Sequence, residues 1–469
     1  MTIIYQVLST GIVSYLVMTM GISYTWPSSV LGLFSSPNTT LDRVMTETEL
    51  SLLGSLSSIS AMMAIPFSGM IMDGLGRKNT CVLFCLLQLI GWTIVVASTS
   101  VEAVLASIFV SGITCSAMLA IPLYVNEICQ DSIRGSMSSG VMMFYGLGML
   151  ISYLLGGLVE YQVMNYTCLS LTVLGMVLLC FVKESPLILI IKGNEKEAAQ
   201  SIAFYRGVSA DSKEVEQEIA KIKRTLNPDL DEETPEEEIL KPEFKPKEKL
   251  STLQFIKKSR STRRAMFVCL TLSSSTVFQG LVVVQVYAAP LFEMAIPSMS
   301  ATVSSVIFAV VTIVAGMIAA YLVEAMGRKS LMVYASVAAA VSCVALGTQI
   351  QFNWGPHWVA AVFMYLYTVT YTVGAGTIPY MYYAEVFLPE IRSFASMLSV
   401  EWTFLCFFIV LYIFNPVVNS IGLGGVFYIF SAVCVLTSVF CLFFMPETKG
   451  RTIEEIQLMF ASPKLRNKV

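Results

Sequence analysis

Residues 73–78 read DGLGRK, and residues 324–329 read EAMGRK. In both places an acid, a glycine and two basic residues follow one long apolar stretch and precede another. A single GRK motif is ordinarily a pair of basic residues that marks the end of a transmembrane helix. Its recurrence at a matching place in the second half of the chain is hard to attribute to chance, and it predicts two copies of one helical unit.

Two further charge signatures recur in the same order. An acid and an arginine seven positions apart occur once in each half, and an acid followed by a hydroxyl residue comes at the end of each half. Charges at helix ends are partly desolvated, so we expect them to pair across neighbouring helices and to latch the cytoplasmic side closed. These gating charges are Asp73, Arg77, Glu127, Arg134, Glu184, Glu324, Arg328, Glu385, Arg392 and Glu447.

Apolar windows long enough to span a bilayer surround these signatures. We predict an all-α membrane protein with twelve transmembrane helices in two pseudo-symmetric halves of six. The expected domains are residues 1–182, a cytoplasmic linker over 183–263, residues 264–446, and a cytoplasmic tail over 447–469. The expected spans lie near residues 4–26, 48–72, 79–99, 102–126, 137–158, 163–182, 264–289, 298–322, 331–350, 357–383, 395–418 and 423–445.

Composition supports this class. Of the 469 residues, 55% are hydrophobic and 13% are charged, against roughly 25% charged in soluble domains. A net charge of −3 argues against a nucleic-acid partner. The eleven cysteines lie mostly in apolar stretches, and His357 is the only histidine, so we expect no metal and no cofactor. Without a catalytic motif, an enzyme is not expected.

Basic residues set the orientation, because they accumulate on the cytoplasmic side of short loops. With both termini in the cytoplasm, Arg43 is the only one of 29 Lys and Arg residues on the outer side. The first apolar stretch is too long for a signal peptide and is expected to be a permanent span. The sequon at Asn38 then lies in the first outer loop, where we expect glycosylation. A second sequon, at Asn165, lies too close to the membrane.

The linker contains an amphipathic pattern and two charge runs. Val215, Ile219 and Ile222 recur on one face and predict a helix over Lys213–Leu226. The acidic run 229–238 and the basic run 241–249 cannot form a packed core and are expected to be flexible.

With these motifs the chain resembles the sugar porters of the major facilitator superfamily, and in general character the animal facilitative glucose and trehalose transporters. The resemblance covers essentially the whole chain. It implies the major facilitator fold and transport of a sugar. Its motifs are Gly69 to Lys78, Pro122 to Gly135, Glu184-Ser-Pro186, Tyr205-Arg-Gly207, Glu324 to Lys329, Gly374 to Pro379, Glu385 to Arg392, and Pro446-Glu-Thr-Lys-Gly-Arg451.

The sugar-binding positions of that family match less well. Met142 stands where a span-five glutamine is usual, and Thr276-Val277 stands where a glutamine pair is usual. Polyhydroxylated solutes need amide and aromatic partners. Either neighbouring residues have taken over this role, or the solute differs from ordinary hexoses. The candidate substrate-binding residues are Gln279, Gln285, Tyr287, Tyr380, Glu401 and Trp402.

The resemblance also indicates whether transport is coupled to protons. Proton-driven sugar porters carry an acid in span one and an arginine in span four. Here span one has no Asp or Glu, and Ser107 occupies the arginine position. We therefore expect a uniporter, working as a monomer in the plasma membrane by alternating access around a sugar such as trehalose or a hexose. A transporter-like nutrient sensor and a carrier of a non-sugar solute stay open as alternatives.

Overall fold

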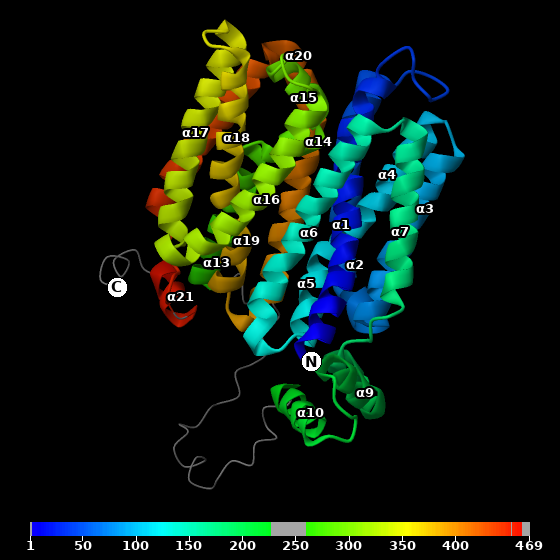
Figure 1. Ribbon diagram of the computed structural model, residues 1–469. Coiled ribbons are helices and arrows are strands. Elements are labelled where there is room, and N and C mark those ends of the chain that lie inside the picture. The colour runs from blue at the N-terminus through cyan, green and yellow to red at the C-terminus, as the bar shows by residue number, and fades with distance from the viewer. Residues whose placement is uncertain (1, 227–258, 452, 462–469) are drawn as a thin grey trace.

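The computed structural model describes residues 2–226, 259–451 and 453–461. Figure 1 shows two groups of long helices side by side, with the short helices α9 (Glu195–Arg206) and α10 (Lys213–Leu226) below one of them. The face of the bundle that carries the short helices is called the linker face here, and the other face is called the opposite face. No strand occurs in the described ranges.

The first half consists of helices joined by short turns. Helix α2 begins with a capping box, in which Thr46 accepts from the Glu49 N–H and Glu49 accepts from the Thr46 N–H. The fourth crossing is broken by a 3-10 turn at Thr114–Ser116. The elements are α1 (Thr2–Phe34), α2 (Glu47–Leu75), α3 (Arg77–Ala97), α4 (Val101–Ile113), α5 (Ala117–Ile128), α6 (Asp131–Leu158) and α7 (Tyr161–Leu179).

The second half has more interruptions. The seventh crossing breaks after Phe278, where Gly280 has a φ of 96°. The tenth breaks between Val373 and Ile378. The elements are α13 (Arg260–Phe278), α14 (Leu281–Val286), α15 (Ala288–Ala295), α16 (Ala301–Met326), α17 (Arg328–Phe352), α18 (His357–Val373), α19 (Ile378–Val386) and α20 (Pro389–Phe444), followed by α21 (Ile453–Ala461).

The described residues contain ten helical stretches that are long and apolar enough to cross a membrane. Two crossings are missing from that number for physical reasons. The seventh is divided among α13, α14 and α15. The last two count as one stretch, Phe394–Phe444, because α20 continues through Gly422, whose φ of 76° and ψ of 164° are not helical. With both restored, the predicted twelve crossings in two halves are confirmed.

The outer surface of the bundle is apolar, as lipid requires. Leu436, Phe443 and Tyr321 are 67%, 64% and 75% exposed. Side chains of this size and exposure would form aggregation-prone patches on a soluble protein. The chain is therefore an integral, multi-pass membrane protein.

The linker helices are α8 (Pro186–Ile191), α9 (Glu195–Arg206) and α10 (Lys213–Leu226). The predicted amphipathic helix over Lys213–Leu226 is confirmed, with Val215 buried and Ile219 and Ile222 packed beside it. The acidic run 229–238 and the basic run 241–249 lie outside the described residues.

One buried side chain ties α9 to the bundle. Gln6, on α1, is fully buried; its amide donates to the carbonyl of Tyr205 at 3.2 Å and accepts from the Gln130 N–H at 2.9 Å. The Tyr205 hydroxyl donates to the carbonyl of Lys183. Burial raises the pKa of the Tyr205 phenol, so this group stays protonated and keeps its role as a donor.

Candidate functional site

The turn between α2 and α3 on the linker face is built around one carboxylate. Glu184 accepts hydrogen bonds from the N–H groups of Arg77 and Lys78 at 2.7 and 3.0 Å. It thereby satisfies the first N–H groups of α3 and places a negative charge at the positive end of that helix. Gly76 has a φ of 98°, and a Cβ there would lie 2.4 Å from Glu184 Oε2. Only glycine satisfies both conditions without strain.

The side chain of Arg77 joins several elements at the same turn. It is 7% exposed and donates to Glu127 on α5 and to Asp73 on α2, both at 3.0 Å. Glu127 is 6% exposed and also accepts from the Ser185 hydroxyl. A buried guanidinium is costly unless its hydrogen bonds are made, and here they are made. The turn, α5 and the start of the linker are thus held together through one arginine.

The second half repeats this arrangement. Gly327 has a φ of 86°, and Glu447 accepts from the N–H groups of Arg328 and Lys329 at 2.9 and 3.0 Å. The Arg328 guanidinium pairs with Glu385 at 2.8 Å, and it also pairs with an acid on its own turn. That acid is Glu324, at 3.0 Å.

A hydroxyl completes each network, and the sequence reasoning did not assign it a role. Thr448 donates to Glu385 at 2.6 Å, as Ser185 does to Glu127. Each hydroxyl follows directly after the capping acid, so the shared acid–hydroxyl pair in the two motifs was the available signal.

Arg134 and Arg392 occupy matching places in the first turns of α6 and α20. Arg134 donates to the carbonyl of Cys129 at 3.4 Å, and Arg392 donates to that of Phe387 at 3.3 Å. Each carbonyl lies five residues before its arginine, in the turn that precedes the helix. The acid of each turn is held instead by the arginine of the GRK motif, so both networks join elements within one half.

Two of the candidate substrate-binding residues keep a large exposed surface. Tyr380 is 45% exposed and lies beside Tyr383, with ring centroids 6.1 Å apart. Trp402 is 41% exposed, and its indole N–H donates to the Ser274 hydroxyl at 2.8 Å. Tyr380 also lies near Tyr24 on α1, which belongs to the other half.

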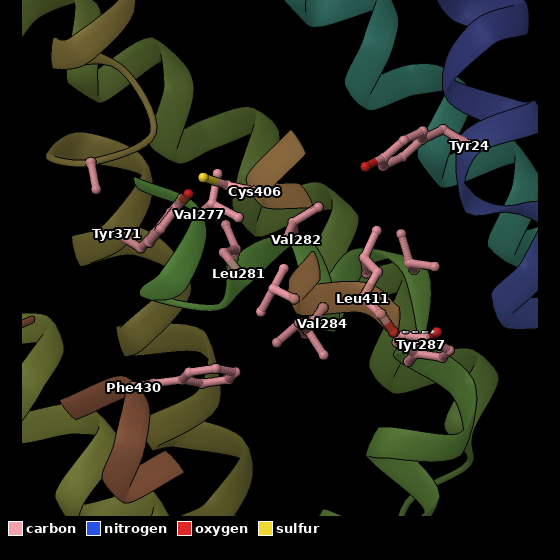
Figure 2. Close-up of a cluster of buried hydrophobic side chains, with 14 of the residues drawn as sticks. Tyr24, Val277, Leu281, Val282, Val284, Tyr287, Tyr371, Cys406, Leu411 and Phe430 are labelled. Atoms are coloured by element: carbon pink, nitrogen blue, oxygen red, sulfur yellow. Dashed lines mark hydrogen bonds between the residues drawn. The ribbon is translucent and has the colours of Figure 1, made fainter. Parts of the chain in front are cut away.

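Three other candidates on the broken seventh crossing are mainly packed. Gln279 is fully buried. Its backbone carbonyl accepts a hydrogen bond from the Tyr367 hydroxyl, and its side-chain amide makes no hydrogen bond to the described residues. Tyr287 is 1% exposed, and its hydroxyl donates to the carbonyl of Leu411 at 3.0 Å. Figure 2 shows this bond and the apolar side chains around it. Gln285 is half-buried.

The last candidates do not lie on the seventh crossing. Glu401 is half-buried on α20, one position before Trp402. Asn38 is exposed in the loop between α1 and α2. Asn165, in the second sequon, is 2% exposed and accepts from the Trp26 indole at 3.1 Å. Its burial agrees with the expectation that this sequon is not used.

Near the opposite face, the two halves are joined by hydrogen bonds. The Tyr153 hydroxyl on α6 donates to the carbonyl of Gln285 at 2.6 Å, and the Ala289 N–H donates to Ser28 on α1 at 2.9 Å. Close packing accompanies them, since a Cβ on Gly157 would lie 2.0 Å from the Thr302 side chain. Neither half can separate from the other there without breaking these contacts.

Two six-helix halves, a duplicated charge network on one face and contacts between the halves near the other define a membrane transporter of the major facilitator type. The chain belongs to the sugar (and other) transporter family, whose model matches residues 4–460.

Known proteins agree with this assignment. A facilitated trehalose transporter Tret1 of Bombyx mori is 26% identical, over 98% of this chain and 88% of its own length. The Tret1 of Polypedilum vanderplanki is 27% identical, over 96% and 87%. The inward open structure of the xylose transporter XylE from E. coli has a TM-score of 0.77 at 19% identity, over 96% of this chain and 98% of its own, and shows the same fold.

Removal of either capping acid is expected to destabilise the protein. In Glu184→Ala or Glu447→Ala the first N–H groups of α3 or α17 lose their acceptor, at a cost of about 1–2 kcal/mol. The midpoint of thermal unfolding of the purified protein should fall in both variants. Glu195→Ala, which removes an exposed pair with Lys223, is the control and should leave it unchanged. Equal midpoints in all three variants would contradict the capping role.

Proposed function

We propose that this chain is a facilitative transporter, a uniporter, that carries a sugar such as trehalose or a hexose by alternating access. Family membership and the relatives named as trehalose transporters support the sugar. One structural observation carries the mechanism: the halves are bridged near the opposite face by Tyr153 and Ser28, while Tyr380, which lies near Tyr24 of the other half, keeps exposed surface. This is the arrangement expected of one half of such a cycle.

The proposed role of the charge networks is gating on the linker face. Each network ties the ends of several helices of one half together through Arg77 or Arg328. A half held in this way can move as one body. Arg134 and Arg392 lie in the first turns that follow, and we infer that they form the contacts that close this face in the other state. The remaining gating charges hold the turns in place.

Within the proposed central site, Tyr380 and Trp402 are assigned to stacking against the ring of the solute, because both combine an aromatic face with open surface. Gln285 and Glu401, both half-buried, are assigned to hydrogen bonding. Gln279 and Tyr287 are retained as supports of the broken helix, because their burial leaves little surface for a solute.

Uniport is proposed because the groups for proton coupling are not where that mechanism needs them. Helix α1 contains no Asp or Glu. Ser107, at the position of the family's arginine, is 1% exposed, and its hydroxyl donates to the carbonyl of Val104 within its own helix. A buried acid with a charged partner is what proton coupling requires.

We further propose that the protein works as a monomer in the plasma membrane, with the linker face in the cytoplasm. The one-sided distribution of basic residues supports the orientation. The main core cluster contains residues of both halves, and the proposed site lies between the halves of a single chain, so a partner is not needed to complete it.

A second candidate function is carriage of a solute other than a common sugar, or sensing of one. Met142, in place of the usual span-five glutamine, is 53% exposed and presents a thioether where an amide would serve a hydroxyl. This observation favours a solute with fewer hydroxyl contacts on that side.

Uptake of labelled solutes tests the proposed function. Oocytes that express the chain are expected to take up trehalose, glucose, fructose or a polyol with saturable kinetics, equally at mildly acidic and neutral pH. Equality is expected because α1 contains no Asp or Glu and Ser107 stands at the arginine position, so the pair of groups that proton-driven relatives use is not present there. Stimulation by acid would overturn uniport, and absence of all flux from protein confirmed at the cell surface would favour the sensor or a non-sugar solute. Uninjected oocytes provide the background.

Mutation of the two turn arginines tests the gate. Arg134→Ala and Arg392→Ala are expected to lower maximal uptake about two- to tenfold at matched surface expression, the effect of losing roughly 0.5–1.4 kcal/mol from a rate-limiting conformational step. Lys223→Ala, which removes an exposed linker pair, is the control and should transport normally. Normal rates in both arginine variants would refute the gate.

Glycosylation tests the orientation. Asn38 lies in an exposed loop of the opposite face, so treatment of the expressed protein with a glycosidase specific for N-linked glycans is expected to increase its mobility on a gel. Asn38→Gln should abolish the change and Asn165→Gln should not. A glycan lost only in Asn165→Gln would contradict the assignment, because that side chain is buried.

A further inference from the structure

Tyr24 carries a hydroxyl that the fold leaves without a partner. It lies on α1, it is 8% exposed, and its hydroxyl makes no hydrogen bond to the described residues. Ser58 on α2 is fully buried, and its hydroxyl approaches that of Tyr24 without forming a hydrogen bond of regular geometry to it or to another described residue. An unpaired buried hydroxyl costs about 1–3 kcal/mol. Two of them side by side on neighbouring helices call for a function.

The direction of Tyr24 indicates what that function is. Figure 2 shows its hydroxyl pointing away from α1 toward the second half, where Val282, Cys406 and Leu411 lie. Its electrostatic neighbours include Tyr380 of α19, which keeps 45% of its surface open. The hydroxyl is therefore buried at the boundary between the halves and is directed at the second half.

Few other polar groups are available at this level. Thr276, where the family usually has a glutamine, donates to the carbonyls of Leu272 and Ala375 and so is already engaged. The Gln279 amide is fully buried within the second half. Val282 on α14 offers only methyl groups. A hydroxyl-bearing solute held by Gln285 and Glu401 of the second half would gain a hydrogen-bonding partner on its other side from the first half.

We propose that the Tyr24 hydroxyl, supported by Ser58, is the polar contact of the first half with the carried solute and recognises one ring hydroxyl of it. A phenol can donate one hydrogen bond and accept another. Tyr24 would donate to the solute oxygen and accept from Ser58, which satisfies both orphaned hydroxyls at once. Ser58 is then a positioning residue. This inference rests on the proposed function, a sugar carried through the space between the halves.

Kinetics with deoxy analogues test the contact. Tyr24→Phe keeps the ring and removes only the hydroxyl. For the transported sugar its KM is expected to rise roughly two- to tenfold, with maximal uptake retained, which is the effect of one lost hydrogen bond. For one monodeoxy analogue, the one that lacks the recognised hydroxyl, wild type and Tyr24→Phe should have the same KM. Ser58→Ala should show the same pattern with a smaller change.

Tyr161→Phe is the matched control. The Tyr161 hydroxyl is also buried without a partner, but its ring packs against Trp26 and Phe34, within the first half. This variant should behave as wild type with every analogue. If Tyr24→Phe leaves all KM values unchanged, or raises them equally for the sugar and for every analogue, the inference is overturned while transport stands.

Ligand protection separates failure of this inference from failure of the proposed function. The same sugars are tested for their effect on the thermal unfolding of purified protein. Stabilisation of wild type but weaker stabilisation of Tyr24→Phe supports the contact, and equal stabilisation overturns it without affecting the proposed function. If no sugar stabilises or is carried by wild type, the proposed function is overturned, and the inference with it.

Discussion

The structure depends on a carboxylate that caps a helix beside a buried arginine, and on the repetition of this unit. Glu184 and Glu447 cap the positive ends of α3 and α17. The glycine that directly precedes each of these helices lets Arg77 or Arg328 pair with a second acid. A buried ion pair is stable only when its hydrogen bonds are nearly complete. This condition requires the glycine, the acids and the hydroxyl to be present together. It therefore determines how helix ends that are far apart in the sequence pack against one another.

The sequence could predict which residues form these networks but not how they pair. Spacing placed Glu127 with Arg134 and Glu385 with Arg392, because each pair shares a turn. In the structure Glu127 pairs with Arg77, and Glu385 pairs with Arg328. Packing between the helices brings each of these arginines close to its acid. Hydropathy located every crossing, yet it could not reveal the break at Gly280, because a broken helix buried in protein is as apolar as a continuous one.

The central region was harder to predict, for a related reason. When all sides of a helix are buried, the apolar period disappears, and the sequence no longer tells which side chains face a cavity. Gln279 and Tyr287 were suitable by type, but the turn after α13 directs them into packing. Tyr24 was not singled out, because a tyrosine in an apolar span is indistinguishable from a packing residue until its unpaired hydroxyl is seen.

The two faces of the bundle differ in the strength of what must change during a cycle. The networks of Arg77 and Arg328 lie inside each half, so neither of these buried ion pairs is separated when the halves move. The contacts between halves near the opposite face are neutral hydrogen bonds, those of Tyr153 and Ser28, each with a net worth of about 1 kcal/mol. Opening that face therefore breaks these bonds and the packing of Gly157 against Thr302, and new contacts on the linker face can offset this cost. Two states of similar free energy are what a carrier without an energy source requires, because bound solute must be able to leave from either side.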